Sequence, residues 1–183
     1  MKGRARMNIT SKSIPAPGRY LPLSAFLLMT VALLSLAPQS LRANGDKPFH
    51  ANFITQFTSV LDFPLLHLTV NGKGKAAYLK TTTAFTDDQV SNLVDGSGSA
   101  TYTLTAKNGD TLVVALVVQP GATIPIDGGV LFSGTYAITG GTGRFSGAAG
   151  SGIFSGTGLF LTETDGIGAF ALVGTISSGN GLK

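Results

Sequence analysis

The sequence contains no cysteine and no tryptophan, only 2 histidines, and few charged side chains, 12% of its 183 residues. Without cysteine the chain can form neither a disulfide scaffold nor a cysteine-ligated metal cluster. With charge this low and an apolar content of 43%, a disordered, solvated chain is excluded. The length suits one domain. We therefore expect a single packed globular core.

Acidic residues are absent from positions 1–43, which nevertheless hold six of the 13 basic residues. The rest of the chain carries all nine acidic residues against seven basic ones, so its net charge is −2 although that of the whole chain is +4. Binding to nucleic acid needs clustered Lys and Arg, and here they are mostly scattered. The sequence thus disfavours a nucleic-acid partner.

The first 43 residues have the pattern of a secretory signal peptide. A basic segment reaches Arg19, an apolar stretch covers 21–37, and small Ala43 suits the cleavage site. A membrane anchor is the alternative, but the uninterrupted apolar part, 25–37, is short of the roughly 20 residues needed to cross a bilayer. We predict a signal peptide at 1–43, a mature domain at 44–183, secretion to the periplasm or outside the cell, and no membrane association after cleavage. The long basic segment leaves Met1 and Met7 as candidate starts.

Short β-rich runs alternate with glycine turn signals, and no segment has a helical period of useful length. Such turn pairs occur at Asn71-Gly72, Asp95-Gly96, Asn108-Gly109, Asp127-Gly128, Gly140-Gly141 and Asp165-Gly166. The predicted strands are 49–60, 65–71, 74–85, 98–107, 110–119, 130–139, 150–162 and 167–177. Eight strands indicate a barrel or a sandwich.

Alternating side chains indicate which strand faces are buried. In 98–107 and 130–139 an apolar face opposes a Ser/Thr face, which predicts one solvated side. Both faces are apolar in 112–118 and 169–176, so these strands need outer cover, either from an oligomer interface or from a loop or the N-terminal segment. The 25 glycines, densest in 134–158, indicate bulges and close backbone approaches, which small barrels need.

The segment Tyr136–Gly152, with Gly140-Gly141-Thr142-Gly143-Arg144-Phe145 inside it, resembles a signature of the allene oxide cyclase and dirigent barrel superfamily. Segments 103–112 and 72–76 are similar to other parts of its secreted bacterial members. The resemblance implies an all-β, eight-stranded antiparallel β-barrel of calycin type, commonly a trimer, here a homo-oligomer of two or three chains. It also implies a central cavity, which in plant relatives holds an apolar substrate. Plant members cyclise an unsaturated fatty-acid epoxide or couple phenoxy radicals. The signature's glycines and Phe145 shape the barrel, so no catalytic residue is carried over.

Other chemistry finds little support. A calcium β-helix repeat would need Asp at Phe145, and a dinucleotide site would need a helix after the glycines. Two histidines, His50 and His67, lack zinc spacing, although His67 could be a cavity base. Two carboxylates lie close together in sequence at Glu163 and Asp165 and again at Asp87 and Asp88, in predicted loops where solvation is the expected role. A calcium ion bound by Asp88 and Asp95 is weakly indicated. We predict no cofactor and no resident metal.

Three functions remain after these exclusions. The preferred one is binding of a small apolar ligand in the barrel, slightly ahead of an extracellular interaction module, with a cyclase-like isomerase or dirigent-like guide third. Candidate cavity residues are the aromatic side chains Phe53, Phe57, Tyr78, Tyr102, Phe132, Tyr136 and Phe154. Arg144 would either face a ligand carboxylate at a barrel mouth or serve as a solvated cap.

Overall fold

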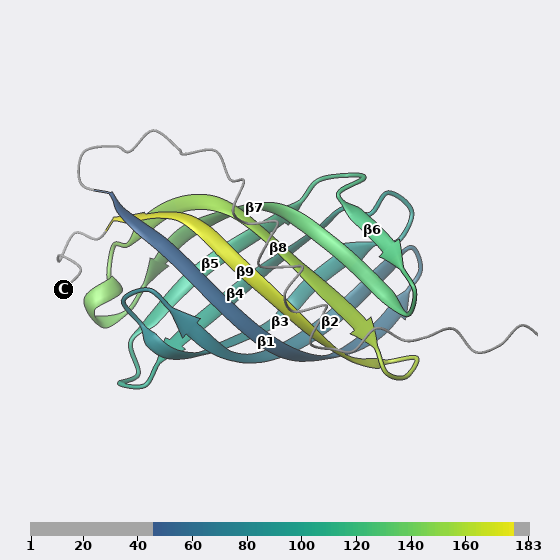
Figure 1. Ribbon diagram of the computed structural model, residues 1–183, viewed down its shortest axis with the longest axis horizontal. Coiled ribbons are helices and arrows are strands. Elements are labelled where there is room, and N and C mark those ends of the chain that lie inside the picture. Colours follow the sequence, from purple (N-terminus) through teal and green to yellow (C-terminus); the bar gives the residue numbers. More distant parts are fainter. Residues whose placement is uncertain (1–45, 178–183) are drawn as a thin grey trace, which may run out of the picture.

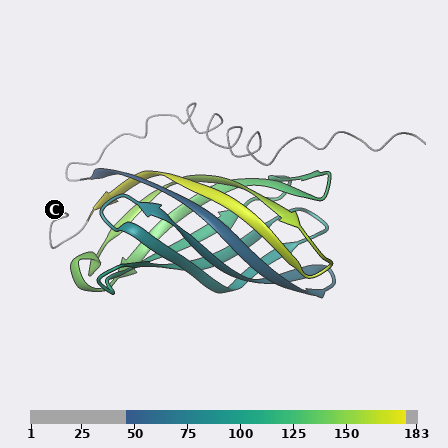
Figure 2. The ribbon, with the colours of Figure 1, turned by 60° about the horizontal axis from the view of Figure 1, so that its bottom comes forward.

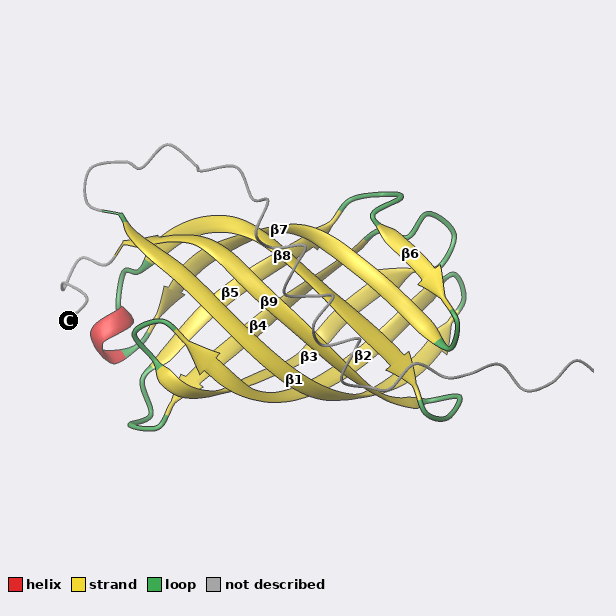
Figure 3. Cartoon of the chain, viewed as in Figure 1, coloured by secondary structure: helices red, strands yellow, loops and turns green. Residues whose placement is uncertain are grey.

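The computed structural model describes residues 46–177, which form nine strands and one short 3-10 turn (Figures 1 and 3). The predicted signal peptide, its cleavage site and both candidate starts lie outside the described residues. The strands are β1 (Lys47–Asp62), β2 (Leu65–Ala76), β3 (Lys80–Asn92), β4 (Gly98–Ala106), β5 (Thr111–Val118), β6 (Thr123–Ile126), β7 (Gly129–Gly141), β8 (Ala149–Phe160) and β9 (Asp165–Ser177). The 3-10 turn, η2, spans Gly143–Phe145.

Eight of these strands close into an antiparallel barrel, as predicted (Figure 2). Neighbours pair in the order β5-β4-β3-β2-β1-β9-β8-β7, and a further β5–β7 pairing completes the ring. The short β6 pairs with β7 as a hairpin at one end of the barrel. Because the ring is closed, the eight strands leave no unpaired sheet edge along their length.

The two ends of the barrel differ. At the packed end lie the turns at 77–79 and 107–110 together with η2, on the left in Figure 1. At the open end lie the turns at 63–64, 93–97, 127–128 and 161–164, together with β6. Within the described chain, no helix is long and apolar enough to cross a membrane.

The tightest part of the core fills the packed end. Phe49, Leu104, Leu112, Phe145 and Ile176 are 1% exposed or less and come from five different elements. In η2 the chain turns Phe145 inward beneath the barrel, and Thr142 fixes this turn by accepting a hydrogen bond at Oγ1 from the Thr111 N–H at 3.0 Å. The Gly-Gly-Thr-Gly-Arg-Phe segment therefore closes the packed end.

Glycines on the inner wall make room for aromatic rings. A Cβ built at Gly152 would lie 2.7 Å from a Tyr136 ring carbon, and one built at Gly156 would lie 2.4 Å from the Phe132 ring. Gly166 is placed in the same way against Phe57, where the gap would be 2.1 Å. These close approaches explain the glycine density of 134–158 and of β9.

Several predicted boundaries were wrong. Asn71-Gly72 does not form a turn but lies inside β2, paired with β1. Glycine is needed at position 72 for packing, because a Cβ there would lie 2.7 Å from Thr55 across the sheet. The strand predicted at 74–85 is divided between β2 and β3 by the turn at 77–79. The pairs Gly140-Gly141 and Asp165-Gly166 also lie in strands, and β6 was not predicted.

The strand faces agree with the predicted alternation. In β4, Ala100, Tyr102, Leu104 and Ala106 are buried, whereas the intervening side chains are exposed or half-buried. In β5, Val113 and Ala115 are half-buried on the outer face and Val117 is 42% exposed. Whether an oligomer covers this outer face stays a prediction.

Candidate ligand-binding site

A cavity of about 440 Å³ occupies the inside of the open end. Its walls are mainly apolar and come from β1 to β5 and from β7 to β9, with Phe57, Leu68, Leu116, Phe132, Phe154 and Phe170 among the lining residues. The turn at 93–97 and Pro125 of β6 line it toward the barrel end. This volume falls in the range typical of small-molecule sites.

Exposed apolar side chains lie around the mouth of this cavity. Phe63 and Val94 are each 72% exposed and Leu161 is 67% exposed, all in turns at the open end. Val94 also lines the cavity. The apolar interior is therefore continuous with an apolar rim, which suits the entry of a poorly water-soluble molecule.

Two polar side chains meet inside the cavity. The Tyr102 hydroxyl donates a hydrogen bond to Oε1 of Gln89 at 2.8 Å, and both residues line the cavity. Burial raises the pKa of Tyr102 far above its usual value, and the nearby Asp88 charge raises it further. Tyr102 is therefore a neutral phenol in the physiological pH range, able to donate or accept a hydrogen bond but not to act as a phenolate base.

A β-bulge in β3 places Gln89 at this position. Opposite β2, Leu68 pairs with Gln89 and Val70 with Thr86, so β3 holds one extra residue between these pairs. Asp88 fixes the bulge, because its Oδ1 accepts hydrogen bonds from the Thr86 hydroxyl at 2.5 Å and from the Thr101 N–H at 2.8 Å. Burial disfavours the Asp88 carboxylate, but these hydrogen bonds outweigh it and lower its pKa.

The charged side chain among the cavity-lining residues is Asp95, in the turn at the mouth. Its Oδ1 accepts a hydrogen bond from the Ser97 N–H at 2.8 Å. Hydrogen bonds from Ser97 lower the pKa of Asp95. Within residues 46–177, no Lys, Arg or His lines the cavity.

Four of the candidate aromatic residues meet at the cavity: Phe57, Tyr102, Phe132 and Phe154. Phe160 and Phe170 also line it, and sequence reasoning missed them, since both faces of β9 are apolar and alternation alone does not single out Phe170 as facing inward. Phe53 is buried beside the site, with its ring centroid 5.1 Å from that of Phe170, but it does not line the cavity.

The other three candidates lie toward the packed end, outside the cavity. Tyr136 is buried with its ring centroid 6.1 Å from that of Phe49, and the Tyr78 hydroxyl donates to the Pro48 carbonyl at 3.2 Å. Arg144 Nε lies 3.4 Å from Oδ2 of Asp110. Arg144 therefore does not face the cavity, and the barrel mouth it was expected to occupy is at the opposite end.

Among the carboxylates considered from the sequence, Asp88 and Asp165 accept side-chain hydrogen bonds. Asp165 accepts hydrogen bonds from the hydroxyls of Thr162 and Thr164 within its own turn. His67 is exposed on the outer wall and does not line the cavity, so the idea of a cavity base is wrong. In the part of the chain that the structure describes, no three His, Cys, Asp or Glu side chains gather as a metal site, and Asp88 lies in a strand rather than a loop.

No family model matches the chain, and no curated protein matches it. Among solved structures, a pterocarpan synthase dirigent protein is similar, with a TM-score of 0.46 and 15% identity, over 78% of this chain and 92% of that one. The assignment as an eight-stranded barrel rests on the strand pairings themselves.

Proposed function

We propose that this barrel binds one small, largely apolar molecule in the cavity at its open end. The observation that carries the proposal is the cavity of about 440 Å³, with aromatic and aliphatic walls and the Tyr102–Gln89 pair inside it. Removing apolar surface from water contributes about 25 cal/mol per Å², so such walls supply most of the binding energy. The exposed rim at Phe63, Val94 and Leu161 gives that molecule an apolar entrance.

The polar pair restricts what the ligand carries. Gln89 accepts the Tyr102 proton through its carbonyl oxygen, so its amide N–H groups remain for a ligand acceptor. A carbonyl, ether or hydroxyl oxygen can take such a hydrogen bond. We therefore propose a mainly hydrocarbon or aromatic ligand with one such oxygen group directed at Gln89.

A fluorescent probe and one cavity-filling variant test the binding. N-phenyl-1-naphthylamine is small, neutral and apolar, and its emission rises in apolar surroundings, so we expect a saturable signal at one probe per chain. In Gly158→Leu the new Cβ has room, since its nearest atoms, on Phe57 and Val130, lie 3.7 Å away. The rest of the leucine then fills the cavity that Gly158 lines.

We expect Gly158→Leu to weaken probe binding by about tenfold or more, equivalent to roughly 1.4 kcal/mol. Ser151→Leu makes a similar change on an exposed position of the same strand and should bind the probe like the parent chain. Thermal unfolding of all three proteins checks that they are folded. Equal probe affinity in a folded Gly158→Leu protein would contradict the proposal.

Catalysis by confinement is a second candidate, favoured by the presence of the Tyr102–Gln89 pair in the cavity. A neutral phenol and an amide can orient a reactive substrate without providing a nucleophile. Incubation with an unsaturated epoxide should then change the rate or the stereochemistry of cyclisation, and Tyr102→Phe should remove that change. An identical product mixture with and without the protein argues against it.

A further inference from the structure

We propose that charge at the cavity mouth selects the ligand class: the site takes neutral or cationic apolar molecules and rejects anionic ones such as carboxylates and sulfonates. This inference rests on the proposed function, because it concerns the same cavity. It follows from where the described charges lie along the barrel axis.

The open end is acidic. Asp62 ends β1, Asp95 and Asp127 lie in the turns that follow β3 and β6, and Glu163 and Asp165 lie at the turn between β8 and β9. Five of the nine acidic residues of the chain therefore surround the open end. The lowered pKa of Asp95 keeps that carboxylate charged well into acidic solution.

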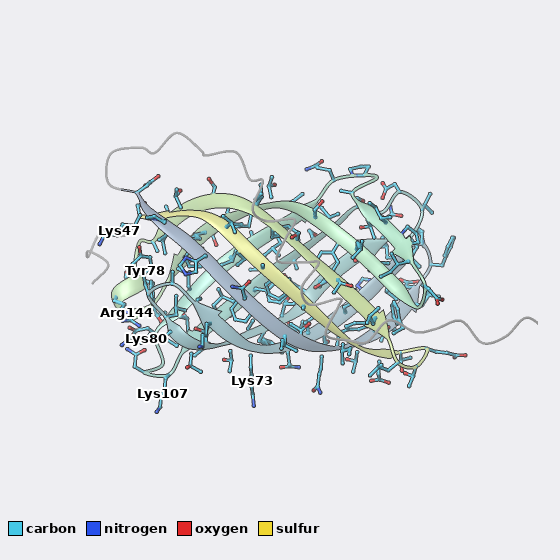
Figure 4. The ribbon with its side chains drawn as sticks, in the orientation of Figure 1. Lys47, Lys73, Tyr78, Lys80, Lys107 and Arg144 are labelled. Carbon is cyan, nitrogen blue, oxygen red and sulfur yellow. The ribbon has the colours of Figure 1, made fainter. Side chains whose placement is uncertain are left out.

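The cations lie in the other half of the barrel. Of residues 46–177, the basic ones are Lys47, Lys73, Lys75, Lys80, Lys107 and Arg144. Lys47 begins β1, Lys80 begins β3, Lys107 follows β4, and Arg144 is in η2, all at the packed end. In Figure 4 the labelled cations gather toward that end and none lies near β6.

Among the described residues, an anionic ligand consequently meets unfavourable charge on its way in. At the mouth it meets like charges, and none of the cavity-lining residues in the described range 46–177 is a cation with which it could pair. Asp88 does not line the cavity, but its carboxylate accepts a hydrogen bond from the Thr101 N–H and adds a negative charge close to Tyr102. Transferring an unpaired anion into such an apolar space is costly, whereas a neutral ligand of the same shape incurs no such cost.

The inference also bears on the epoxide chemistry implied by the sequence resemblance. A free fatty-acid epoxide carries a carboxylate, and Arg144, for which a role facing a ligand carboxylate was one of two considered, lies at the packed end in contact with Asp110. A neutral ester, alcohol, ketone or phenol meets no such obstacle. The cavity therefore favours neutral oxygen-bearing molecules over free acids.

A matched pair of probes tests the selection. N-phenyl-1-naphthylamine is neutral, and anilinonaphthalene sulfonate has the same ring skeleton with one sulfonate added. Only the fluorescence that Gly158→Leu removes is counted as cavity binding, which separates it from dye on the outer wall or on the cationic end. At low ionic strength we expect the cavity to bind the neutral probe at least about tenfold more tightly, and the difference to shrink as salt is added.

Rim neutralisation supplies the decisive variant. Asp62→Asn, Asp127→Asn and Glu163→Gln together remove three negative charges from positions that do not line the cavity. We expect the sulfonate to bind about tenfold more tightly and the neutral probe to change less than about twofold. Thr81→Lys, Thr83→Lys and Ser151→Lys together change the net charge equally, at exposed positions nearer the packed end, and should affect the sulfonate much less.

Each result has one reading. If the neutral probe gives no signal that Gly158→Leu removes, the proposed function is wrong, and the inference is overturned with it. If the neutral probe binds but the sulfonate binds equally well, and rim neutralisation does not strengthen sulfonate binding, the cavity binds ligands without charge selection and only this inference is overturned. If both triple variants strengthen sulfonate binding equally, net charge rather than the mouth is responsible, which also overturns it.

Discussion

At the scale of single residues, Gly143 shows how tightly the packed end is built. Its φ of 57° lies in the left-handed region, and a Cβ there would meet the Asp110 carboxylate at well below contact distance. That carboxylate is held in place, because Oδ2 accepts a hydrogen bond from the Asn108 amide at 2.9 Å and lies 3.4 Å from Arg144 Nε. Gly143 is thus required both by its backbone angle and by its neighbour.

We expect Gly143→Ala to lower the free energy of unfolding by about 2 to 3 kcal/mol, the sum of left-handed strain and displacement of the Asp110 contacts. Gly147→Ala is the matched control, since Gly147 also has a positive φ, 70°, but nothing lies within 4 Å of a Cβ there. The control should lose only about 1 kcal/mol. Urea unfolding of both variants measures the difference, and equal losses would show that the Asp110 contacts contribute nothing.

Asp88 should give the protein a pH-dependent stability. Because the Thr86 and Thr101 hydrogen bonds lower its pKa in the folded state below the ordinary value of 3.8, the carboxylate stabilises the fold above that value. That contribution is lost as the pH falls through the folded-state pKa, since the carboxylate is then protonated in both states. Asp88→Asn keeps an acceptor oxygen but removes the charge.

We therefore expect the parent protein to be more stable than Asp88→Asn at neutral pH, and the difference to shrink at about pH 3. Urea unfolding at both pH values measures it. Asp87→Asn, at the adjacent position of the same bulge, controls for the change in net charge. A difference that stays constant with pH would contradict the role given to the Asp88 carboxylate.

At the scale of the elements, the β2–β3 turn is built from unusual residues. Tyr78 and Lys80 have φ values of 67° and 63°, a region that residues other than glycine rarely adopt. Lys47 lies over the Tyr78 ring, with Nζ 6.0 Å from its centroid. This turn contains no Gly, Asn or Asp, so no turn signal marked it and the predicted strand 74–85 ran across it.

Lys80→Gly should relieve this strain and stabilise the fold by about 0.5 to 1 kcal/mol, because glycine adopts a positive φ without steric cost. Lys107→Gly, in the corresponding β4–β5 turn, is the control: Lys107 is not among the residues with positive φ, so the change should destabilise by a similar amount. Thermal unfolding measures both. If both substitutions destabilise equally, the left-handed angle at Lys80 carries no strain.

Strand faces could be predicted from the sequence where one side is buried and the other is wet, as in β4, since the two-residue period is then plain. The period fails in β3, where the bulge breaks it within the polar run Thr86-Asp87-Asp88-Gln89, which resembles a loop. Sequence reasoning missed β6 because it is four residues long and contains Pro125, a residue confined to edge strands.

The candidate site could be predicted only in part, because alternation identifies inward side chains in regular strands but not at a bulge. Phe57, Tyr102, Phe132 and Phe154 were found because inward aromatic side chains follow from alternation. Gln89 was not, since its approach to Tyr102 depends on the extra residue in β3 and on the β3–β4 register, which no local pattern encodes. The charge separation between the ends likewise becomes visible only once the strand order fixes which turns share an end.

At the scale of the whole molecule, packing differs between the two ends. The packed end holds side chains with almost no exposure, whereas the open end encloses the cavity. Side chains beside an empty space lose contacts, so local opening there should need less energy than at the packed end. We therefore expect backbone amides of residues 89–99 to exchange hydrogen faster than those of Leu104, Leu112 and Val114.

A bound ligand should reduce this difference. At a probe concentration 100 times Kd, binding opposes any opening that destroys the site by up to about 2.7 kcal/mol, so amides of residues 89–99 should become strongly protected. Hydrogen exchange with and without N-phenyl-1-naphthylamine measures the change, and Gly158→Leu should show none because its cavity is filled. Dye bound on the outer wall would not slow local unfolding at the cavity mouth. Saturable fluorescence without slower hydrogen exchange at residues 89–99 would therefore show that the probe binds outside the cavity.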